Sequence, residues 1–484
     1  MVKRIQITGN TLFDAATLHE LVADSEGREL TLTQLDGLAS RITDYYHNHG
    51  YPLSRAIIPA QTIHAGIVTI EVIEAKYGEI KLDNRSRVTS PLLTDTLSSL
   101  KGGEPIDQES MDHALLLLSD VPGVAVDATL KPGEKVATSD LVIVTSPTPF
   151  VSGSVQLDNY GNKYTGRNRL GANLFISNPL HHGDMLSFSA LTSGSGMNYG
   201  RIGYDTLLNS YGTHAGVSYS ALHYILGDSL SNLNAHGTAD VGSGWIRHPL
   251  IRRRDVNVYG QVQYDHLKLD DHYDASNIQT DRHLDNWTGT LSGDERNVDG
   301  VNTWSASITT GNLGFDNGTA QLADAASAKT QGSFSKWNLN LSRLQSLGNE
   351  TSLYAALSGQ WSNANLDPSQ QMVAGGPYTV RAYDMGVLSG DEGYLGTVEL
   401  RHNLSRTWQA IAFWDSEHVI VNTNTWVAGI NSATLTGAGL GLDWSGQDSW
   451  NVRTYVAARI DTPPASLVPV SSSSRIWVQV GKGF

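Results

Sequence analysis

Residues 375–396, GGPYTVRAYDMGVLSGDEGYLG, lie in the long connection 363–392 between two segments of strand character. A connection of this length inside a compact β domain is usually functional or disordered. The glycines and proline at 375–377 supply turn chemistry, and residues 378–383 alternate as in a short hairpin with Arg381 near its tip. The segment therefore predicts an ordered loop that presents an arginine.

The strands on both sides of this loop belong to a long region of alternating polarity that begins at Phe150. Within residues 256–264, for example, Val256, Val258 and Val262 share one face, and polar residues such as Asn257 occupy the other. A soluble sandwich alternates in the same way, so the alternation alone leaves the class open. The alternation of polar and apolar residues therefore predicts strands, but it does not show whether the apolar face points into a protein core or outward to lipid.

The sequence has no run of eighteen apolar residues that would predict a transmembrane helix, and a closed barrel is the other structure that satisfies the backbone in lipid. Three features favour such a barrel over a sandwich. Compact turns alternate with longer connections, as in outer-membrane barrels. Residues 150–484 divide into sixteen strand segments, and Ile476, Val478, Val480 and Phe484 share one face at the C-terminus. We therefore predict a sixteen-stranded antiparallel barrel over residues 150–484.

The first 149 residues follow a different pattern, in which strands and helices alternate. A β-α-α-β-β order is predicted for residues 1–76, with the apolar spacing of Leu35, Leu38, Ile42 and Tyr45 or Tyr46 in the second helix. The same order is repeated in residues 77–149. The fold class is therefore mainly β, with two α+β domains (1–76 and 77–149) before the barrel (150–484).

These motifs resemble the TpsB family of two-partner secretion outer-membrane transporters, which includes FhaC-, ShlB- and CdiB-like proteins of the BamA-type superfamily. The family has a VRG(F/Y) tetrad followed by LSGD, and this chain has Val380-Arg381-Ala382-Tyr383 and residues 388–391 in the same order. Alanine stands where glycine is usual. The tandem β-α-α-β-β units resemble POTRA domains, so the resemblance covers most of the chain.

The resemblance implies a lock between the loop and the barrel wall. Family members carry an F-x-D element whose carboxylate pairs with the tetrad arginine, and Phe413-Trp414-Asp415 matches it. Strand alternation gives Phe413, Asp415 and Glu399 to the lumen face. A guanidinium in a lumen needs a partner, and a bidentate carboxylate suits it. We expect Arg381 to bind Asp415, with Glu399 as a second partner.

The resemblance also implies function and location. The expected activity is export of a large unfolded exoprotein, of the haemagglutinin, haemolysin or contact-dependent inhibition toxin class, across the outer membrane of a Gram-negative bacterium. POTRA domains would lie in the periplasm and bind the cargo along edge strands by β-augmentation. The residues expected to face the cargo are Val124, Val126, Ala128, Leu130, Leu141 and Ile143.

Other partners follow from the same assignment. Outer-membrane lipid and lipopolysaccharide would surround the barrel, and the barrel assembly machinery would recognise a C-terminal insertion signal that ends in Phe484. The chain starts directly in a strand pattern, so we expect a form without its signal peptide. No plug helix or linker of the family type is recognisable before the first POTRA domain.

Composition excludes several other classes. Lys plus Arg is 33 and Asp plus Glu is 48, and a net charge of −15 argues against a nucleic-acid-binding face. The absence of cysteine excludes disulfides and thiolate metal sites. Neither His181-His182 nor His47 with His49 has a third ligand at usable spacing, so no metal site is expected. We expect no cofactor and no catalytic residues.

Two alternatives stay open at this point. A barrel insertase of the BamA or TamA kind would share the tetrad and the POTRA domains but act on other barrels; two POTRA domains and the LSGD context favour secretion. A barrel enzyme would need an outward-facing catalytic cluster, and the sequence does not suggest one.

Overall fold

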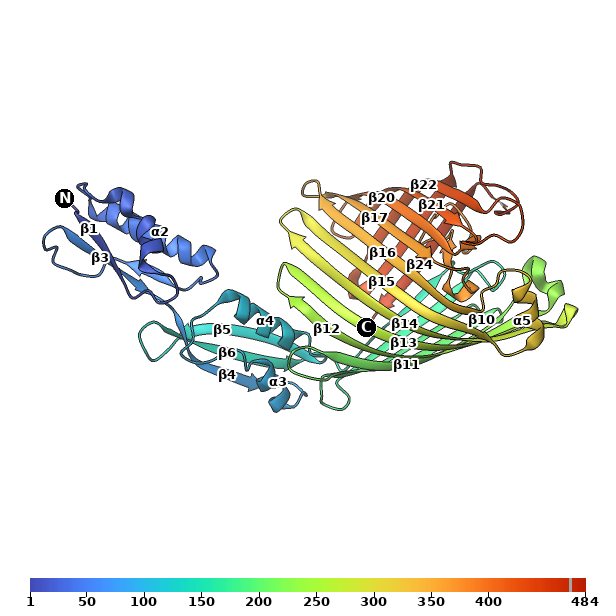
Figure 1. Cartoon of the computed structure of the whole chain (residues 1–484), viewed down its shortest axis with the longest axis horizontal. Coiled ribbons are helices and arrows are strands. Elements are labelled where there is room, and N and C mark those ends of the chain that lie inside the picture. Colours follow the sequence, from blue (N-terminus) through green and yellow to red (C-terminus); the bar gives the residue numbers. More distant parts are fainter. Residues whose placement is uncertain (470–471) are drawn as a thin grey trace. The chain divides into compact units, whose positions relative to one another are not determined.

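A computed structural model describes residues 1–469 and 472–484 of the chain. The chain divides into two units, Met1–Thr148 and Pro149–Phe484. Helices and sheets alternate in the first unit, and strands form a closed wall in the second (Figure 1). The further division of the first unit at residues 76 and 77 stays a prediction.

The first α+β domain has the predicted strand and helix order. Three strands form a sheet in the order β1-β3-β2, with β1 parallel to β3. A capping box of Thr31 and Gln34 starts the long helix, whose buried face includes Ile42 and Tyr46. The elements are β1 (Arg4–Thr8), α1 (Ala15–Glu20), η1 (Ala23–Ser25), α2 (Leu32–Asn48), β2 (Arg55–Ile57) and β3 (Ile67–Ile73).

A buried carboxylate ties this domain together. Glu74, directly after β3, accepts hydrogen bonds from the backbone N–H groups of Thr11 (2.7 Å) and Leu12 (2.9 Å) and from the Tyr46 hydroxyl (2.8 Å). Burial opposes the charge, but these hydrogen bonds, with one from the Thr11 hydroxyl, outweigh burial and lower the pKa of Glu74. The charged carboxylate therefore fixes the β1–α1 connection against the end of β3 and the helix α2.

The second α+β domain repeats the pattern. Its sheet has the order β4-β6-β5, so β6 is central and β5 lies at an edge. The elements are β4 (Lys76–Asn84), α3 (Ser90–Thr96), α4 (Gln108–Ser119), β5 (Val124–Pro132) and β6 (Thr138–Pro147). Within residues 1–469 and 472–484, no helix has both the length and the apolar character needed to cross a membrane.

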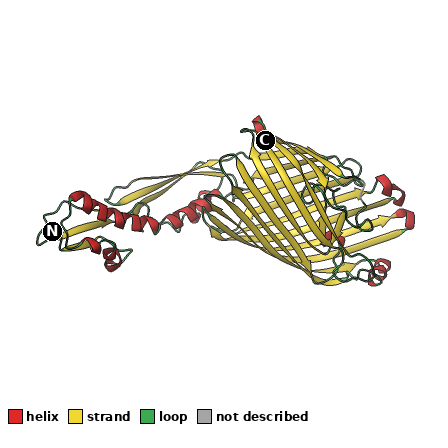
Figure 2. Ribbon diagram, turned by 90° about the horizontal axis from the view of Figure 1, so that it is seen from above, coloured by secondary structure: helices red, strands yellow, loops and turns green. Residues whose placement is uncertain are grey.

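The second unit is a barrel of strands (Figure 2). The strand order closes on itself, and the predicted count of sixteen antiparallel strands is confirmed. The last strand, β24, pairs with the first, β7, and closes the wall. The strands are β7 (Val151–Asp158), β8 (Arg169–Ser177), β9 (Asp184–Thr192), β10 (Met197–Leu207), β11 (His214–Ile225), β12 (Ala235–Arg252), β13 (Val256–Tyr273), β14 (Ile278–Asn297), β15 (Gly300–Phe315), β16 (Gly332–Ser346), β17 (Thr351–Ser362), β20 (Glu392–Asn403), β21 (Trp408–Ile420), β22 (Ser432–Ser445), β23 (Trp450–Arg459) and β24 (Ser474–Gly483).

Side chains of successive strand residues point to opposite sides of this wall. On β21, Trp414 is 43% exposed on the outside, whereas its neighbours Phe413 and Asp415 are buried inside. The outer surface is a band of exposed apolar residues that includes Val262, Trp287, Leu291, Ile308, Trp337, Leu357, Trp361, Tyr394, Val398, Leu440 and Ile476. An apolar exterior around a polar lumen is the pattern of a membrane barrel.

The two ends of the barrel differ in their connections. One end has compact turns, with the short helix η5 (Gln447–Ser449) in one of them. The other end has longer connections, which contain η2 (Asp228–Leu233), η3 (Asp274–Ser276) and α5 (Gly318–Ala325). The connection between β17 and β20, residues 363–391, belongs to this second end and carries the candidate site.

Candidate functional site

The loop 363–391 folds as a small hairpin with a long, irregular tip. After η4 (Pro368–Gln370), strand β18 (Met372–Ala374) pairs with β19 (Leu388–Gly390). The predicted hairpin over residues 378–383 is wrong, because that segment consists of turns within the tip. Gly375 and Gly376 have φ of +84° and +117°, which side chains rarely adopt, and they end the ladder at β18.

The structure brings Arg381 together with both predicted carboxylates. Its Nε donates to Asp415 Oδ2 (2.9 Å), its Nη2 to Asp415 Oδ1 (2.7 Å), and its Nη1 to Glu399 Oε1 (2.6 Å). The backbone N–H of Arg381 also donates to Asp415 Oδ2 (3.2 Å). Arg381 is 4% exposed and Asp415 is 0% exposed, so the pair is bidentate and almost fully removed from water.

The surrounding groups complete the charge balance of this lock, which we define as Arg381, Asp415 and Glu399. Arg401 donates from Nε (2.8 Å) and Nη2 (2.6 Å) to the second oxygen of Glu399. The Thr397 hydroxyl donates to Asp415 Oδ1 (3.1 Å). Two guanidinium groups thus face two carboxylates, and both oxygens of each carboxylate are hydrogen-bonded. This balance is what buried charges require.

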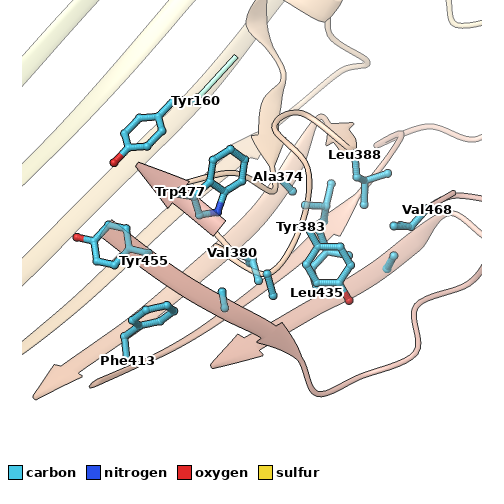
Figure 3. Packing of buried hydrophobic residues seen from close by; sticks show 14 of the residues in the cluster. Tyr160, Ala374, Val380, Tyr383, Leu388, Phe413, Leu435, Tyr455, Val468 and Trp477 are labelled. Atoms are coloured by element: carbon cyan, nitrogen blue, oxygen red, sulfur yellow. The ribbon is translucent and has the colours of Figure 1, made fainter. Parts of the chain in front are cut away.

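Aromatic rings enclose the guanidinium. The Arg381 Cζ lies 3.5 Å from the ring centroid of Phe413 and 4.9 Å from that of Tyr455 on β23. The two rings meet edge to face. Figure 3 shows both rings beside the loop segment that carries Val380. A cation over aromatic faces gains further stabilisation when water is excluded. The sequence analysis identified Phe413 but missed Tyr455. Strand alternation along β23 places Tyr455 on the inner face of the wall, and this alternation could have identified it.

The other tetrad residues are buried in the same cluster. Val380, Ala382 and Tyr383 are each at most 2% exposed. The Tyr383 hydroxyl donates to Asp461 Oδ1, and Asp461 Oδ2 accepts the backbone N–H of Thr436 (2.6 Å). The backbone carbonyl of Arg381 accepts the indole N–H of Trp477 on β24 (2.7 Å). The tip is therefore attached to β21, β22 and β24 at once.

The base of the loop has an ion pair that the sequence did not suggest. Arg282 on β14 donates from Nε to Asp367 Oδ2 (2.5 Å) and from Nη1 to Asp271 Oδ2 (2.7 Å). In the order of the closed barrel, β14 lies opposite β24. Because the base of the loop reaches β14 and its tip reaches β24, the loop spans the lumen from one side of the barrel wall to the opposite side.

The residues predicted to bind cargo divide between an edge strand and a central strand. Val124, Val126, Ala128 and Leu130 lie on β5, which is an edge strand of its sheet. Leu141 and Ile143 were also predicted at an edge, and this is wrong, because β6 pairs with β4 on one side and β5 on the other. Both side chains are at most 1% exposed and belong to the core, as does Val124 at 5%.

Phe484 lies at the barrel closure, beyond the last ladder pair of β24. Its backbone N–H donates to the carbonyl of Gly153 (3.0 Å), and its carbonyl accepts the N–H of Gly153 (3.0 Å). Phe484 is 64% exposed, so its ring lies at the surface of the barrel. Among the residues described, no group of three or more His, Asp or Glu side chains is arranged to hold a metal ion.

Comparison with known proteins gives two family matches. The family described as Haemolysin secretion/activation protein ShlB/FhaC/HecB matches residues 137–443. The family described as POTRA domain, ShlB-type, matches residues 1–75. The first match covers more than half of the chain, and it includes the loop and every member of the lock.

Individual relatives agree with these matches. The heme/hemopexin transporter protein HuxB of Haemophilus influenzae (strain 86-028NP) is 29% identical over 477 residues, which cover 96% of this chain and 84% of HuxB. The outer membrane transporter CdiB of Escherichia coli is 23% identical over 493 residues, covering 94% and 82%. The solved structure of CdiB from Escherichia coli superposes with a TM-score of 0.77 at 21% identity, over 100% of this chain and 90% of that one, which shows the shared fold.

Proposed function

The chain belongs to the haemolysin secretion/activation protein family ShlB/FhaC/HecB, and we propose that its cargo is a large, unfolded exoprotein of the haemagglutinin, haemolysin or contact-dependent inhibition toxin class. The protein is an outer-membrane barrel transporter of the two-partner secretion type, with POTRA domains in the periplasm.

The observation that carries this proposal is a lumen crossed by a loop that buried charges hold in position. Sixteen strands enclose a channel wide enough for an extended chain once the loop moves. Arg381 is held by two carboxylates and two rings, so the loop is fixed firmly, yet it has no covalent tie to the wall. We propose that Arg381, Asp415 and Glu399 lock the resting pore and that passage of the cargo requires the loop to be displaced.

We further propose that the protein performs no covalent chemistry. The names of its relatives describe transporters, which supports this proposal. Folding of the exoprotein outside the cell would then drive its movement, because a chain that has folded outside cannot slide back through the pore.

Recognition of the cargo is proposed for the free edge of β5. An extended segment added to this edge would gain backbone hydrogen bonds, and the exposed Ala128 with the half-buried Val126 and Leu130 would contact its side chains. The central position of β6 leaves β5 and β4 as the two edges of this sheet.

Proline placed singly at Asp127 and at Ala128 tests this edge. Successive N–H groups point to opposite sides of a strand, so one of the two prolines removes a donor from the free edge and the other removes one from the β5–β6 ladder. The edge-facing proline is expected to lower secretion about two- to tenfold, as the loss of one or two hydrogen bonds predicts, without loss of the domain's fold. Prolines placed singly at Lys81 and Leu82 on the opposite edge strand, β4, are the matched control. The backbone N–H of Arg85 donates to β6, so the same alternation gives the Lys81 donor to the ladder and the Leu82 donor to the free edge. Equal effects at both edges would reject β5 as the recognition strand.

The proposed function is tested by co-producing the transporter with large, repetitive exoproteins of the same organism, first of all any that its own operon encodes. Cargo in the medium is measured with and without the transporter. We expect secretion only when the transporter is present, with unchanged levels of other outer-membrane barrels. The insertase alternative predicts the opposite result, namely a loss of other barrels from the membrane and no dedicated cargo.

A second cargo class follows from HuxB, which is described as a heme/hemopexin transporter. Uptake of labelled haem by cells that produce only this chain would favour that class over an exported polypeptide. The free edge strand favours the polypeptide, because it offers backbone pairing that only an extended chain can use.

Three further partner assignments are also proposals. The apolar outer band, with a groove of about 910 Å³ lined by Val262, Ile308 and Trp337, suits the acyl chains of outer-membrane lipid and lipopolysaccharide. The exposed ring of Phe484 at the barrel closure suits recognition by the barrel assembly machinery. The net charge of −15 supports the absence of a nucleic-acid partner.

A further inference from the structure

The closure between the first and last barrel strands, which we call the seam, is held by a short ladder. The register pairs Ser154–Asp158 of β7 with Gln479–Gly483 of β24. Strand β24 begins earlier, at Ser474, and its residues before Gln479 pair with β23 on one side only. At this part of the seam, the other side of β24 faces residues that follow β7.

A single side chain continues the ladder beyond Asp158. Asn159 donates from Nδ2 to the Ile476 carbonyl (2.9 Å), and its Oδ1 accepts the N–H of Val478 (2.8 Å). The backbone N–H of Asn159 donates to the Val478 carbonyl (3.2 Å). All three hydrogen bonds involve Asn159 alone, whereas a run of five residue pairs joins Ser154–Asp158 to β24. This half of the seam therefore has the smaller share of direct pairing.

The tip of the lumen loop supplies an ionic contact at this position. Asp384, three residues after Arg381, accepts a hydrogen bond from Arg167 Nη1 (2.6 Å) on the β7–β8 connection. Its other oxygen accepts one from Arg475 Nη2 on β24. The Asp384 side chain is 10% exposed and that of Arg475 is 16% exposed, so water screens this arm of the bridge weakly, whereas the Arg167 side chain is 42% exposed.

Packing around the bridge joins the same three segments. Asn162 donates from Nδ2 to the Met385 carbonyl (2.9 Å). The buried ring of Tyr160 meets Tyr378 of the loop and Trp477 of β24 edge to face, at centroid distances of 5.6 and 5.9 Å. Figure 3 shows Tyr160 and Trp477 beside the loop. Residues from both sides of the seam therefore contact the loop, which adds to the direct pairing between them.

We propose that Asp384 is a positioning residue that latches the seam, because it bridges a cation on each side of it. Arg167 and Arg475 contact the same carboxylate, so they lie close together and repel each other when that carboxylate is neutralised. The latch uses a different carboxylate, different cations and different strands from the lock at Arg381. It therefore ties the position of the loop to closure of the barrel wall.

This latch has a consequence for transport, which rests on the proposed function. A loop that leaves the lumen must take Asp384 away from Arg167 and Arg475. Opening of the pore then also weakens the contacts between the two sides of the seam near Asn159 and Arg475. The barrel can therefore widen when cargo passes. A loop attached only at Arg381 would open the pore without any effect on the wall.

Hydrogen exchange of the purified full chain in detergent tests the latch without any cargo, so its outcome is separate from the secretion test. Asp384→Asn keeps the size of the side chain and removes its charge. Peptides that cover residues 151–159 and 474–483 are expected to exchange at least about fivefold faster than in the parent protein. Arg167→Gln, at a side chain that is 42% exposed, removes one arm with little risk to folding and is expected to give a smaller increase.

Asp461→Asn is the matched control. Asp461 also binds the loop tip, through Tyr383, but it bridges no cations across the seam. The Asp461→Asn variant is expected to exchange hydrogen in residues 151–159 at the rate of the parent protein. The proposal is overturned if Asp384→Asn and Arg167→Gln leave the seam peptides at the parent rate, or if Asp461→Asn accelerates them equally.

Discussion

Replacing Arg381 by alanine is expected to lower secretion of the exoprotein about tenfold or more, in a barrel that still assembles. The change leaves Asp415 and Glu399 facing each other in a desolvated lumen with one cation, Arg401, in place of two. Removing one member of a buried ion pair typically costs about 3–5 kcal/mol. The loop tip then loses its defined position, and alternative positions in the lumen obstruct the path of the cargo.

Arg381 and Asp415 are expected to act as one coupled pair. Asp415→Ala is expected to impair secretion as Arg381→Ala does, and the double variant is expected to be no worse than the more severe single one. Cargo in the medium is the measurement, and heat-modifiable mobility shows that each barrel is folded. Should the two defects simply add, the residues act separately, and Arg381 would be tested next against Glu399.

Arg453→Ala is the matched control for the lock. Arg453 on β23 forms the same kind of bidentate pair with Asp443 on β22, with distances of 3.0, 3.0 and 2.7 Å. Its side chain is 48% exposed, and its hydrogen bonds are to the wall strand β22. Exposed pairs contribute roughly 0–1 kcal/mol, so secretion is expected to stay near the parent level.

The lock could be predicted because strand parity determines which side chains enter a lumen. With β20 and β21 in alternation, Glu399, Phe413 and Asp415 had to share the inner face, whatever the path of the loop. The engagement of Arg381 with both carboxylates at once could not be predicted. It depends on where the tip lies relative to two neighbouring strands, and local sequence does not encode that distance.

The errors have physical causes of the same kind. Alternation of Tyr378, Val380 and Tyr383 suggested a hairpin, but two glycines with positive φ and Pro377, which lacks a donor, end the ladder before them. The edge assignment of Leu141 and Ile143 failed because the order of strands across a sheet is a tertiary property. A parallel pairing of β4 with β6 puts the last strand in the middle. Asp384 was missed because its partners lie 217 and 91 residues away.

Ala382 occupies the third position of the tetrad, where glycine is usual in the family, so its methyl group needs space against the barrel wall. Ala382 does not have a positive φ, so alanine causes no backbone strain there. Its methyl group faces Gly437 on β22, where an added Cβ would lie 2.4 Å from that of Ala382. Real Cβ atoms essentially never approach within 3.0 Å. The methyl group is therefore accommodated because the wall has no side chain at Gly437.

Gly437→Ala is expected to push the tip off β22 and reduce secretion about five- to tenfold, since overpacking a well-packed site costs about 1–3 kcal/mol. Adding Ala382→Gly to this variant exchanges the two methyl positions and is expected to restore most of the secretion. Ala382→Gly alone leaves a methyl-sized space and should have a smaller effect. Gly396→Ala on β20 is the control, because its nearest non-neighbouring atom would lie 4.0 Å away. A double variant as impaired as Gly437→Ala alone would show that β22 does not position the tip through this contact.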